Sequence, residues 1–486
     1  MSSLASPLIL SSQSPRNLKH LPINTTNTDP PVRGDNIWGQ ILGLSFPNIV
    51  SNLAMYSTAV VTTLCISRLD RPDLLAAFGL GNLITNVFGL SIGVGLTSVL
   101  ETLVAQAYGA DNMHLAAIHL NRSRLVVVIA SLPSFVFLWY TDKLLLLMGQ
   151  DESVSALAAQ FTRWNLIGLL PFFLYNCSTS YLRSCQRPQP PLIVNVIGSI
   201  LHLGLSVYLI NTLRYELVGA AIATSINNIV RFFLVEIYFV YQPFLHGHEW
   251  SREILSLKGI GHFMGLAIPS FFLIFIEWSC FELTAVIAGW VSTIALSAHV
   301  SANNVIAVAY MIPMGIAAAT SALTGACLGE GAPKLAYKFA ITGIALSVIV
   351  SVAYGFLLYR YANPLAALYT TDSDALKILV TLIKIIAVYV VGDAINCAEA
   401  GVLRGLGKQS IGAKYQTIVM YGVLLPLAFG LHFQYGVAGI WFASMLGMMT
   451  SAAGFAYIIS KTDFMECSRR AVLEHSHRFV GNLASP

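Results

Sequence analysis

Carboxylate side chains stand inside long apolar runs of this chain, where they would be shielded from water. Glu277 and Glu282 belong to one such run, and Asp393 and Glu399 belong to another. An apolar medium disfavours a charged carboxylate, so burial favours its neutral, protonated form. A group of this kind can take up a proton or cation on one side and release it on the other. The acids therefore predict reversible ion binding within a membrane.

Position within the run separates these acids. Glu277 and Asp393 are near the middle of their runs and are the strongest candidates for a site. Glu282 follows Glu277 by five residues, which turns it about 140° away on a helix and leaves a site and simple helix packing equally open. Glu101 and Glu399 are nearer the ends of their runs, so we expect packing or interfacial roles for both.

Other polar residues in the apolar runs are expected to be structural. For Arg231 and Glu236 we expect either an ion pair with each other or side chains that extend to the cytoplasmic interface. His202 and His299 are isolated from other metal-binding or catalytic groups and predict hydrogen bonds between packed helices. The seven cysteines form no C-x-x-C pair and lie mostly in apolar runs, so buried free thiols are expected.

The sequence gives no reason to expect an enzyme. It has neither a Gly-rich phosphate loop followed by Lys-Ser/Thr nor a His-Glu-x-x-His helix. His246, His248 and Glu249 lack further ligands at fixed spacing, which favours a solvated connector over a metal site. The formal charge of +4 is too small and scattered for nucleic-acid binding. No catalytic residue, metal or cofactor is predicted beyond the coupling ion itself.

The elements that position the acids are membrane spans. Charged residues make up 10% of the 486 residues and apolar residues 56%, in long runs. Stretches near the length needed to cross about 30 Å of hydrocarbon occur at 40–66, 74–100, 117–140, 160–182, 191–212, 218–243, 262–289, 297–325, 336–359, 378–403, 413–431 and 437–459. The predicted fold class is an all-α polytopic membrane protein with twelve transmembrane helices.

Twelve spans place both termini on one side, and the distribution of basic residues says which. Roughly two thirds of the 27 Lys and Arg fall in segments that are cytoplasmic if the N-terminus is cytoplasmic. The predicted organisation is a disordered cytoplasmic tail at 1–36, a first lobe at 37–243, a cytoplasmic connector at 244–261, a second lobe at 262–460 and a cytoplasmic tail at 461–486.

The two halves resemble each other. An ungapped shift of 222 residues aligns Pro47 with Pro269, Gly93 with Gly315, Thr102 with Thr324, and Gly109-Ala110 with Gly331-Ala332. Farther on, Leu182-Arg183 resembles Leu403-Arg404. Each half has six spans, so equivalent spans run in the same direction. The pattern predicts two six-helix lobes related by a parallel pseudo-two-fold repeat, with substrate between or within them near the midplane.

Four motifs resemble a known family. The run LETLVAQAYGA at 100–110 is similar to the family signature LETLxxQAYGA, and EWSCFE at 277–282 is similar to EWWxFE. LSAH at 296–299 with YMIP at 310–313, and GVLRGLGKQ at 401–409, follow in the family's order and spacing. The chain thus resembles the multidrug and toxic compound extrusion (MATE) family, particularly its eukaryotic branch, over nearly all of 38–460.

The resemblance implies twelve helices in two lobes around a V-shaped cleft, and cation-coupled export of organic compounds. It implies that Glu277 carries the proton or cation and that Asp393 is its acidic partner. Tyr389 matches a position implicated in cation binding in some bacterial members. Glu282 matches a second acid used by organic-cation exporters.

Two departures from the family pattern restrict which properties of the family are expected of this chain. Many prokaryotic members have an Asp where this chain has Val61-Thr62-Thr63, so ion coupling is expected to rest on the second lobe. Animal organic-cation exporters have a Glu where this chain has Asn304, which allows a plant-like or broader substrate range. The predicted substrate-pocket residues are Glu282, Asn304, Trp278 and Asn396.

The resulting expectation is a monomeric antiporter of the plasma membrane or of a vacuole-like organelle membrane. It would export small organic compounds, often cationic, in exchange for protons by alternating access. Sodium coupling is the close alternative, and a flippase for a lipid-linked molecule is another. A membrane sensor or scaffold without transport is the alternative from a different class.

Overall fold

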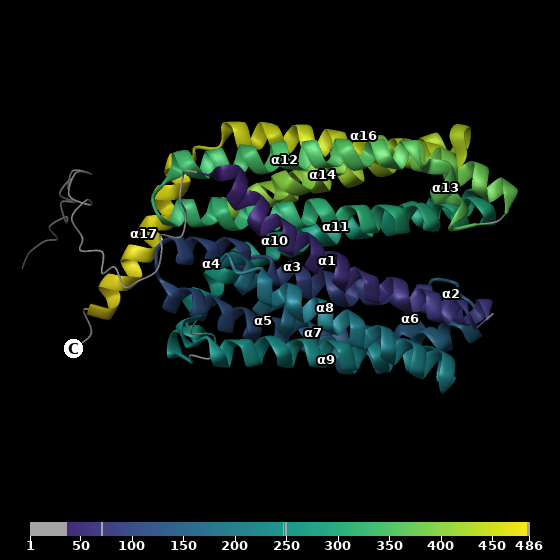
Figure 1. The fold of residues 1–486 in the computed structure, drawn as a ribbon, viewed down its shortest axis with the longest axis horizontal. Coiled ribbons are helices and arrows are strands. Elements are labelled where there is room, and N and C mark those ends of the chain that lie inside the picture. Colours follow the sequence, from purple (N-terminus) through teal and green to yellow (C-terminus); the bar gives the residue numbers. More distant parts are fainter. Residues whose placement is uncertain (1–35, 70, 246, 248–249, 371, 484–486) are drawn as a thin grey trace, which may run out of the picture.

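The structure is a computed structural model that describes residues 36–69, 71–245, 247, 250–370 and 372–483. Every regular element within these residues is a helix (Figure 1). The predicted tail at 1–36 lies outside them except for its last residue, and so do His246, His248 and Glu249 of the predicted connector.

The first half of the chain forms long helices with short connections. They are α1 (Ile37–Ser67), the interrupted helix α2, η2, α3 and α4 (Pro72–Thr85, Asn86–Leu90, Ser91–Thr97 and Leu100–Gly109), α5 (Met113–Trp139), the short α6 (Thr141–Leu147), α7 (Glu152–Ser184), α8 with η3 (Gln189–Ser206 and Val207–Thr212) and α9 (Glu216–Tyr241). We call α1 to α9 the N-lobe. The turns η4 (Pro243–Leu245) and η5 (Arg252–Leu255) follow.

The second half repeats this layout and adds a terminal helix. It contains α10 (Leu257–Val291), α11 (Thr293–Gly329), α12 (Pro333–Arg360), the short α13 (Ala362–Ala367), α14 (Ser373–Gly405), α15 with η6 (Gln409–Val419 and Met420–Leu424), α16 (Leu425–Lys461) and α17 (Phe464–Leu483). We call α10 to α16 the C-lobe.

The predicted twelve spans are all helical. Ten helical stretches of the described residues are long and apolar enough to cross a membrane. One of these, Gln409–Lys461, holds two spans, because its backbone breaks at Gly436 with φ 57° and ψ −139°. The twelfth span is α7, whose 33 residues are long enough to cross but include polar side chains such as Asn165 and Asn176.

The helices extend beyond the predicted spans. For example, α14 covers Ser373–Gly405, whereas the apolar run is 378–403. Its 33 residues correspond to about 50 Å of helix against about 30 Å of hydrocarbon. Asp372 caps its first turn by accepting hydrogen bonds from the backbone N–H groups of Asp374 and Ala375 at 2.8 and 3.0 Å. Capped polar ends of this kind are invisible to a search for apolar residues.

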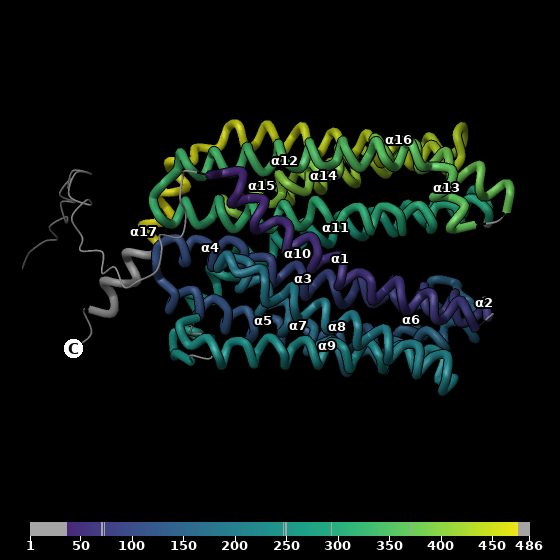
Figure 2. The backbone as a smooth tube through the Cα atoms, in the orientation of Figure 1, coloured from purple at the N-terminus to yellow at the C-terminus, as the bar shows by residue number. Residues whose placement is uncertain are grey.

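Each lobe has its own apolar core, and the lobes meet at one end. One group of buried apolar side chains comes from the N-lobe and the start of α10, and a second comes only from the C-lobe. The lobes converge at the end that carries α17 and diverge toward α13 and α6 (Figure 1). Helix α1 begins beside α12 of the C-lobe and ends beside α2 of the N-lobe (Figure 2).

The predicted repeat appears in the contacts between the lobes. Gly95 of α3 faces α10, where a Cβ on the glycine would lie 2.6 Å from Cα of Phe271. Gly315 of α11 faces α1 in the same way, 2.7 Å from the backbone nitrogen of Ile49. Ile49 and Phe271 are 222 residues apart, as predicted, but Gly95 and Gly315 are 220 apart. The ungapped pairing of Gly93 with Gly315 is therefore wrong by two residues.

Helices α4 and α11 cross so closely that the contact points have room only for glycine. A Cβ on Gly109 would lie 1.9 Å from the carbonyl oxygen of Ala326, and one on Gly329 would lie 2.0 Å from that of Gln106. The offset between these equivalent contacts is again 220 residues. Gly109 thus corresponds to Gly329 rather than to Gly331, and the crossing is symmetric about the pseudo-two-fold axis.

This crossing makes a first prediction. Gly109→Ala is expected to lower the melting temperature by several degrees, since the new methyl group meets backbone atoms that no rotamer change can move. The control is Gly265→Ala on α10, where a Cβ would have no atom within 4 Å. That change is expected to stabilise the helix by roughly 0.5–1 kcal/mol. Equal melting temperatures for the two purified variants would contradict the close crossing.

The last helix and the cysteines complete the fold. The predicted tail at 461–486 contains α17, in which Ser468 donates a hydrogen bond to the carbonyl of Leu328 at 3.0 Å. His262 of α10 and Glu474 of α17 are also in contact, at 2.8 Å. Helix α17 therefore ties α10 and α11 together at the end where the lobes converge. All seven cysteines are buried free thiols, as predicted.

Candidate functional site

The two mid-helix acids of the C-lobe come together. Glu277 projects from α10 and is half-buried, whereas Asp393 on α14 is 3% exposed. The two carboxylates are close enough to act on each other electrostatically. Two acids that share one low-dielectric region do not readily hold two negative charges, so the region favours a bound proton or cation.

Aromatic residues pack around Asp393. The Tyr389 hydroxyl lies 3.4 Å from Oδ1 of Asp393, to which it donates a hydrogen bond, four residues earlier on the same helix. The Tyr389 ring makes edge-on contacts with Trp441 and Phe281, at centroid distances of 5.9 and 6.5 Å. Trp441 in turn packs on His299 at 5.3 Å. This packing fixes the orientation of the Tyr389 hydroxyl.

Tyr310 of α11 closes the site from a third helix. Its hydroxyl interacts with the Cys397 thiol and electrostatically with both Glu277 and Asp393. In the sequence Tyr310 stands out only as part of the YMIP motif, which does not indicate that it lies at the site. Its position is 33 residues from Glu277 on a neighbouring helix, so spacing alone could not reveal the contact.

The predicted substrate-pocket residues differ in their exposure. Glu282 and Trp278 are half-buried on α10, and Asn304 is exposed on α11. Asn396 is instead 3% exposed, and its Oδ1 accepts a hydrogen bond of 2.7 Å from Ser451 of α16. Asn396 therefore lies within the packing of the C-lobe, while the other three residues lie at accessible positions.

A groove lies along α10 and includes Ile276, the residue before Glu277, in its lining. Its volume is about 540 Å³, and it lies between α10 and α15, with Phe272, Phe275 and Tyr421 among its lining residues. Lys414 is its charged lining residue. Tyr421 reaches across the groove to Ser279, with 2.7 Å between the two hydroxyl oxygens. The groove is mostly apolar and supplies little polar chemistry of its own.

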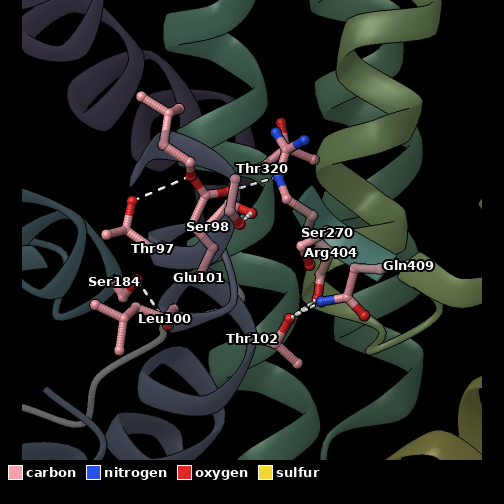
Figure 3. Close-up of polar contacts among 12 residues, drawn as sticks. Thr97, Ser98, Leu100, Glu101, Thr102, Ser184, Ser270, Thr320, Arg404 and Gln409 are labelled. Carbon is pink, nitrogen blue, oxygen red and sulfur yellow. Dashed lines mark hydrogen bonds and ion pairs between the residues drawn. The ribbon is translucent and has the colours of Figure 1, made fainter. Parts of the chain in front are cut away.

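A second polar cluster joins the lobes at the end where they converge. The guanidinium of Arg404 on α14 pairs with the carboxylate of Glu101 on α4 at 2.7 Å, and the two side chains are 14% and 17% exposed. Thr102 donates a hydrogen bond to the carbonyl oxygen of Arg404 and accepts one from the Gln409 amide (Figure 3). Gln106 donates to the carbonyl of Gly405 at 3.2 Å. We call Glu101, Thr102, Gln106, Arg404 and Gln409 the interlobe cluster.

Glu101 lies between two arginines from equivalent positions of the repeat. It pairs with Arg404 and also acts electrostatically on Arg183 of α7. The motif Leu182-Arg183, which resembles Leu403-Arg404, was the signal that could have revealed this arrangement. Glu101 therefore has the packing role expected for it, as an ion pair between helices of the two lobes. Arg404 also acts on Glu277, so it links the interlobe cluster to the C-lobe acids.

Two further acids are enclosed by neighbouring helices. Glu399 is 2% exposed, which agrees with the packing role expected for it. Glu236 pairs with Arg124 of α5 at 2.6 Å, so the pairing with Arg231 that the sequence left open is wrong. The position of Glu236 along α9 did not identify the helix that faces it.

Features that would indicate an enzyme are weak. The run Gly89-Leu90-Ser91-Ile92-Gly93 matches the Gly-x-Ser-x-Gly pattern of nucleophile elbows. However, Ser91 is fully buried, and its hydroxyl donates to the carbonyl of Val87 at 2.6 Å. Within the described residues, no group of three His, Cys, Asp or Glu side chains is arranged to hold a metal ion.

Comparison with known proteins identifies the family. The family model MatE matches residues 47–208 and again residues 269–429, which together make up more than half of the chain. The chain belongs to the MATE family. The double match also confirms the internal repeat, and the MATE fold accounts for the two six-helix lobes.

Individual MATE proteins agree with this assignment. The chain is 30% identical to mouse multidrug and toxin extrusion protein 2, across 89% of this chain and 75% of that protein. It is 28% identical to human multidrug and toxin extrusion protein 1, across 91% and 78%. The crystal structure of the eukaryotic MATE transporter AtDTX14 has a TM-score of 0.85 at 23% identity, covering 90% of this chain and 99% of that one. The predicted eukaryotic MATE-type membrane transporter is confirmed at this level.

Proposed function

We propose that the chain is a secondary antiporter that exports small organic compounds in exchange for protons. The observation that carries the proposal is the electrostatic interaction between Glu277 and Asp393 inside the C-lobe, together with that between Arg404 and Glu277. The ion-binding acids are thereby connected to the polar contacts that hold the two lobes together. The extrusion of drugs and toxins named for the relatives agrees with an exporter.

The proposed cycle is alternating access, in which protonation and substrate binding exclude each other. A proton from outside neutralises the Glu277–Asp393 region, which releases substrate outward. Return to the cytoplasmic side and loss of the proton restore a charged site that binds new substrate. The distribution of basic residues favours cytoplasmic termini. The interlobe cluster, at the end that carries α17, is then the cytoplasmic closure in this cycle, and the structure corresponds to a cytoplasm-closed state.

The available energy is enough for modest accumulation. A tenfold proton gradient supplies about 1.4 kcal/mol per proton. One-for-one exchange with a monovalent organic cation moves no net charge, so the membrane potential does not drive it. Each pH unit then supports about a tenfold concentration ratio of substrate. We further propose that the protein acts as a monomer, in the plasma membrane or a vacuole-like organelle membrane.

Sodium is the second candidate for the coupling ion. The Tyr389 hydroxyl beside Asp393, with Glu277 nearby, provides oxygen atoms suited to a hard cation. A sodium ion and a proton would neutralise the same two acids. Transport under an applied proton or sodium gradient therefore distinguishes the two ions, whereas the geometry of the site does not.

The deciding experiment is transport by the purified protein in proteoliposomes. A pH gradient, a sodium gradient or neither is imposed, and uptake of a fluorescent amphipathic cation is followed. Proton antiport predicts accumulation of about tenfold per pH unit, independent of sodium. Accumulation that follows the sodium gradient instead assigns the coupling to sodium. No uptake under any gradient would contradict the export of organic cations and leave neutral or anionic metabolites or lipid-linked molecules as substrates.

A further inference from the structure

A buried arginine of the N-lobe has no acidic partner. Arg231 lies on α9, and its side chain belongs to a residue that is only 2% exposed. The nearest acid along the helix, Glu236, pairs with Arg124 instead. Among the residues that the structure describes, no carboxylate forms an ion pair with Arg231. A guanidinium in a membrane span keeps its charge, so this one requires a partner of another kind.

The immediate neighbours of Arg231 are neutral. Its Nη2 lies 3.4 Å from the Ser199 hydroxyl of α8, a long contact, and its Nε has no hydrogen-bond partner. The guanidinium lies against the backbone of α8, where a Cβ on Gly198 would approach Nε to 2.4 Å. The same Cβ would lie 2.8 Å from Oδ1 of Asn227, which is also without a partner. Glycine at 198 thus leaves the space that the guanidinium occupies.

Polar side chains from four helices surround this position. Tyr175 of α7 acts electrostatically on Arg231 and donates a hydrogen bond of 2.8 Å to Asn195 of α8. Asn195 in turn donates to Ser51 of α1 at 2.8 Å. His202, one turn beyond Ser199 on α8, also interacts with Arg231, and its Nδ1 has no partner. These side chains are neutral, so they do not compensate the charge of the guanidinium.

A second arginine adds to the positive charge. Arg183 of α7 interacts with the same Tyr175, and its Nε likewise has no hydrogen-bond partner. The acid that acts on Arg183 is Glu101, which already forms an ion pair with Arg404. The polar interior of the N-lobe therefore carries more positive than negative charge.

The equivalent position of the C-lobe is neutral. Tyr175, Asn195 and Arg231 have counterparts 221, 221 and 220 residues further on, at Asn396, Gln416 and Ser451. There the Ser451 hydroxyl contacts Oδ1 of Asn396 at 2.7 Å and Oε1 of Gln416 at 2.5 Å. In the C-lobe the Ser451 hydroxyl occupies the position that corresponds to Arg231, so the fold does not require an arginine there. The charge of Arg231 is a specific property of the N-lobe.

We propose that the N-lobe contains an anion site centred on Arg231, which binds one small monovalent anionic group, either a halide or a carboxylate. The fork of guanidinium N–H groups suits such a group, and the Nε of Arg231 has no hydrogen-bond partner among the described residues. Ser199, His202 and Asn227 lie around the site. This inference goes beyond the proton exchange proposed above and does not depend on it, since the site is in the other lobe.

The first test uses the wild-type protein alone. The melting temperature is measured in detergent at constant pH and ionic strength, while sodium chloride or sodium acetate replaces the sodium salt of a bulky sulfonate buffer. A ligand that binds only the folded protein raises the melting temperature in a saturable manner, here by at least about 2 °C at a large excess over the dissociation constant. Melting temperatures that respond to neither anion in a saturable way would overturn the proposal.

Variants then assign the effect to Arg231. Arg231→Met is expected to abolish the saturable shift, and Arg231→Lys is expected to weaken apparent binding by about tenfold or more because the planar fork is lost. The control is Arg163→Met on α7, an exposed arginine paired with Asp142, which should leave the shift unchanged. If Arg231→Met does not fold, the lysine variant decides. A shift of wild-type size and midpoint in the folded Arg231 variants would refute the site.

The two sources of the anion are separated by the salts and by transport. Stabilisation by chloride but not by acetate assigns the site to an inorganic anion. Stabilisation by acetate assigns it to a carboxylate. In that case Arg231→Met should raise the KM for a zwitterionic substrate by about tenfold while leaving a purely cationic one unchanged. This result would also distinguish the site from the C-lobe acids, whose loss affects ion coupling.

Discussion

Replacing Glu277 with Gln is expected to abolish substrate accumulation driven by a pH gradient. The amide is nearly the same size but does not titrate, so the proton gradient loses its coupling to substrate. Accumulation should fall from about tenfold per pH unit to about one. Asp393→Asn should have the same effect, because the two acids act on each other within one site. Uptake into proteoliposomes under an imposed gradient measures both.

A matched control lies on the same helix. Glu282 is also a half-buried acid of α10, five residues beyond Glu277, and faces another direction. Glu282→Gln is expected to keep the tenfold accumulation per pH unit, even if the affinity for substrate changes. Gradient-driven accumulation by Glu277→Gln at the wild-type level would show that the proton is carried elsewhere. Glu399, which is 2% exposed on α14, would be the next acid to replace.

Loss of coupling must be separated from loss of folding. Exchange of labelled for unlabelled substrate across the membrane needs the substrate site but no net proton movement. In the proposed cycle the neutral amide mimics the protonated acid, so Glu277→Gln is expected to lose this exchange together with accumulation, while its melting temperature stays at the wild-type value. A variant that fails in both assays and melts at a lower temperature reports a damaged fold, and the isosteric Asp393→Asn then tests the assignment.

Sequence patterns were informative wherever a single helix carries the signal. Glu277 and Asp393 stand in the middle of apolar runs, and an acid at such a depth is costly without a function. Tyr389 is one turn from Asp393, so the contact between them follows from helical spacing. The repeat was recognisable because both halves must build equivalent crossings, although the two-residue shift between Gly95 and Gly315 needed the backbone contacts.

Contacts between helices far apart in the sequence were out of reach. Glu101 and Arg404 are 303 residues apart, and hydropathy gives the depth of a residue but not the helix that faces it. The same limit led to the wrong pairing of Glu236 with Arg231, although both lie on α9. For Glu399, its place near the end of the apolar run left packing and interfacial roles both open, and its burial on α14 agrees with packing.

The second large effect is expected from the ion pair between Glu101 and Arg404. Glu101→Gln leaves the guanidinium of Arg404 poorly compensated between the lobes, and for this partly buried pair we expect a cost of about 3 kcal/mol, the lower end of the range for buried pairs. Because the pair joins the lobes only where they converge, this cost should fall on the cytoplasm-closed state. A change of 3 kcal/mol shifts an equilibrium more than about 100-fold. We therefore expect the variant to populate a state in which the lobes separate at this end.

The distance between spin labels on the two lobes measures this shift. His114 on α5 and Lys338 on α12 are exposed positions near the converging end, one in each lobe. Labels there should move apart in Glu101→Gln and in Arg404→Gln relative to the wild type. Thr102→Ser keeps a hydroxyl for Gln409 and for the carbonyl of Arg404, so it should leave the distance unchanged.

The double variant Glu101→Gln/Arg404→Gln decides between a gating contact and simple packing. It removes both charges together, and two amides can still hydrogen-bond across the interface, so the distance should return toward the wild-type value. Its proton coupling should nevertheless remain impaired, since Arg404 also acts on Glu277. Closure of the lobes and proton coupling would then be separable properties, although both depend on the guanidinium of Arg404. Unchanged label distances in both single variants would instead make the pair a static contact, and the movement of the lobes would have to depend on other contacts.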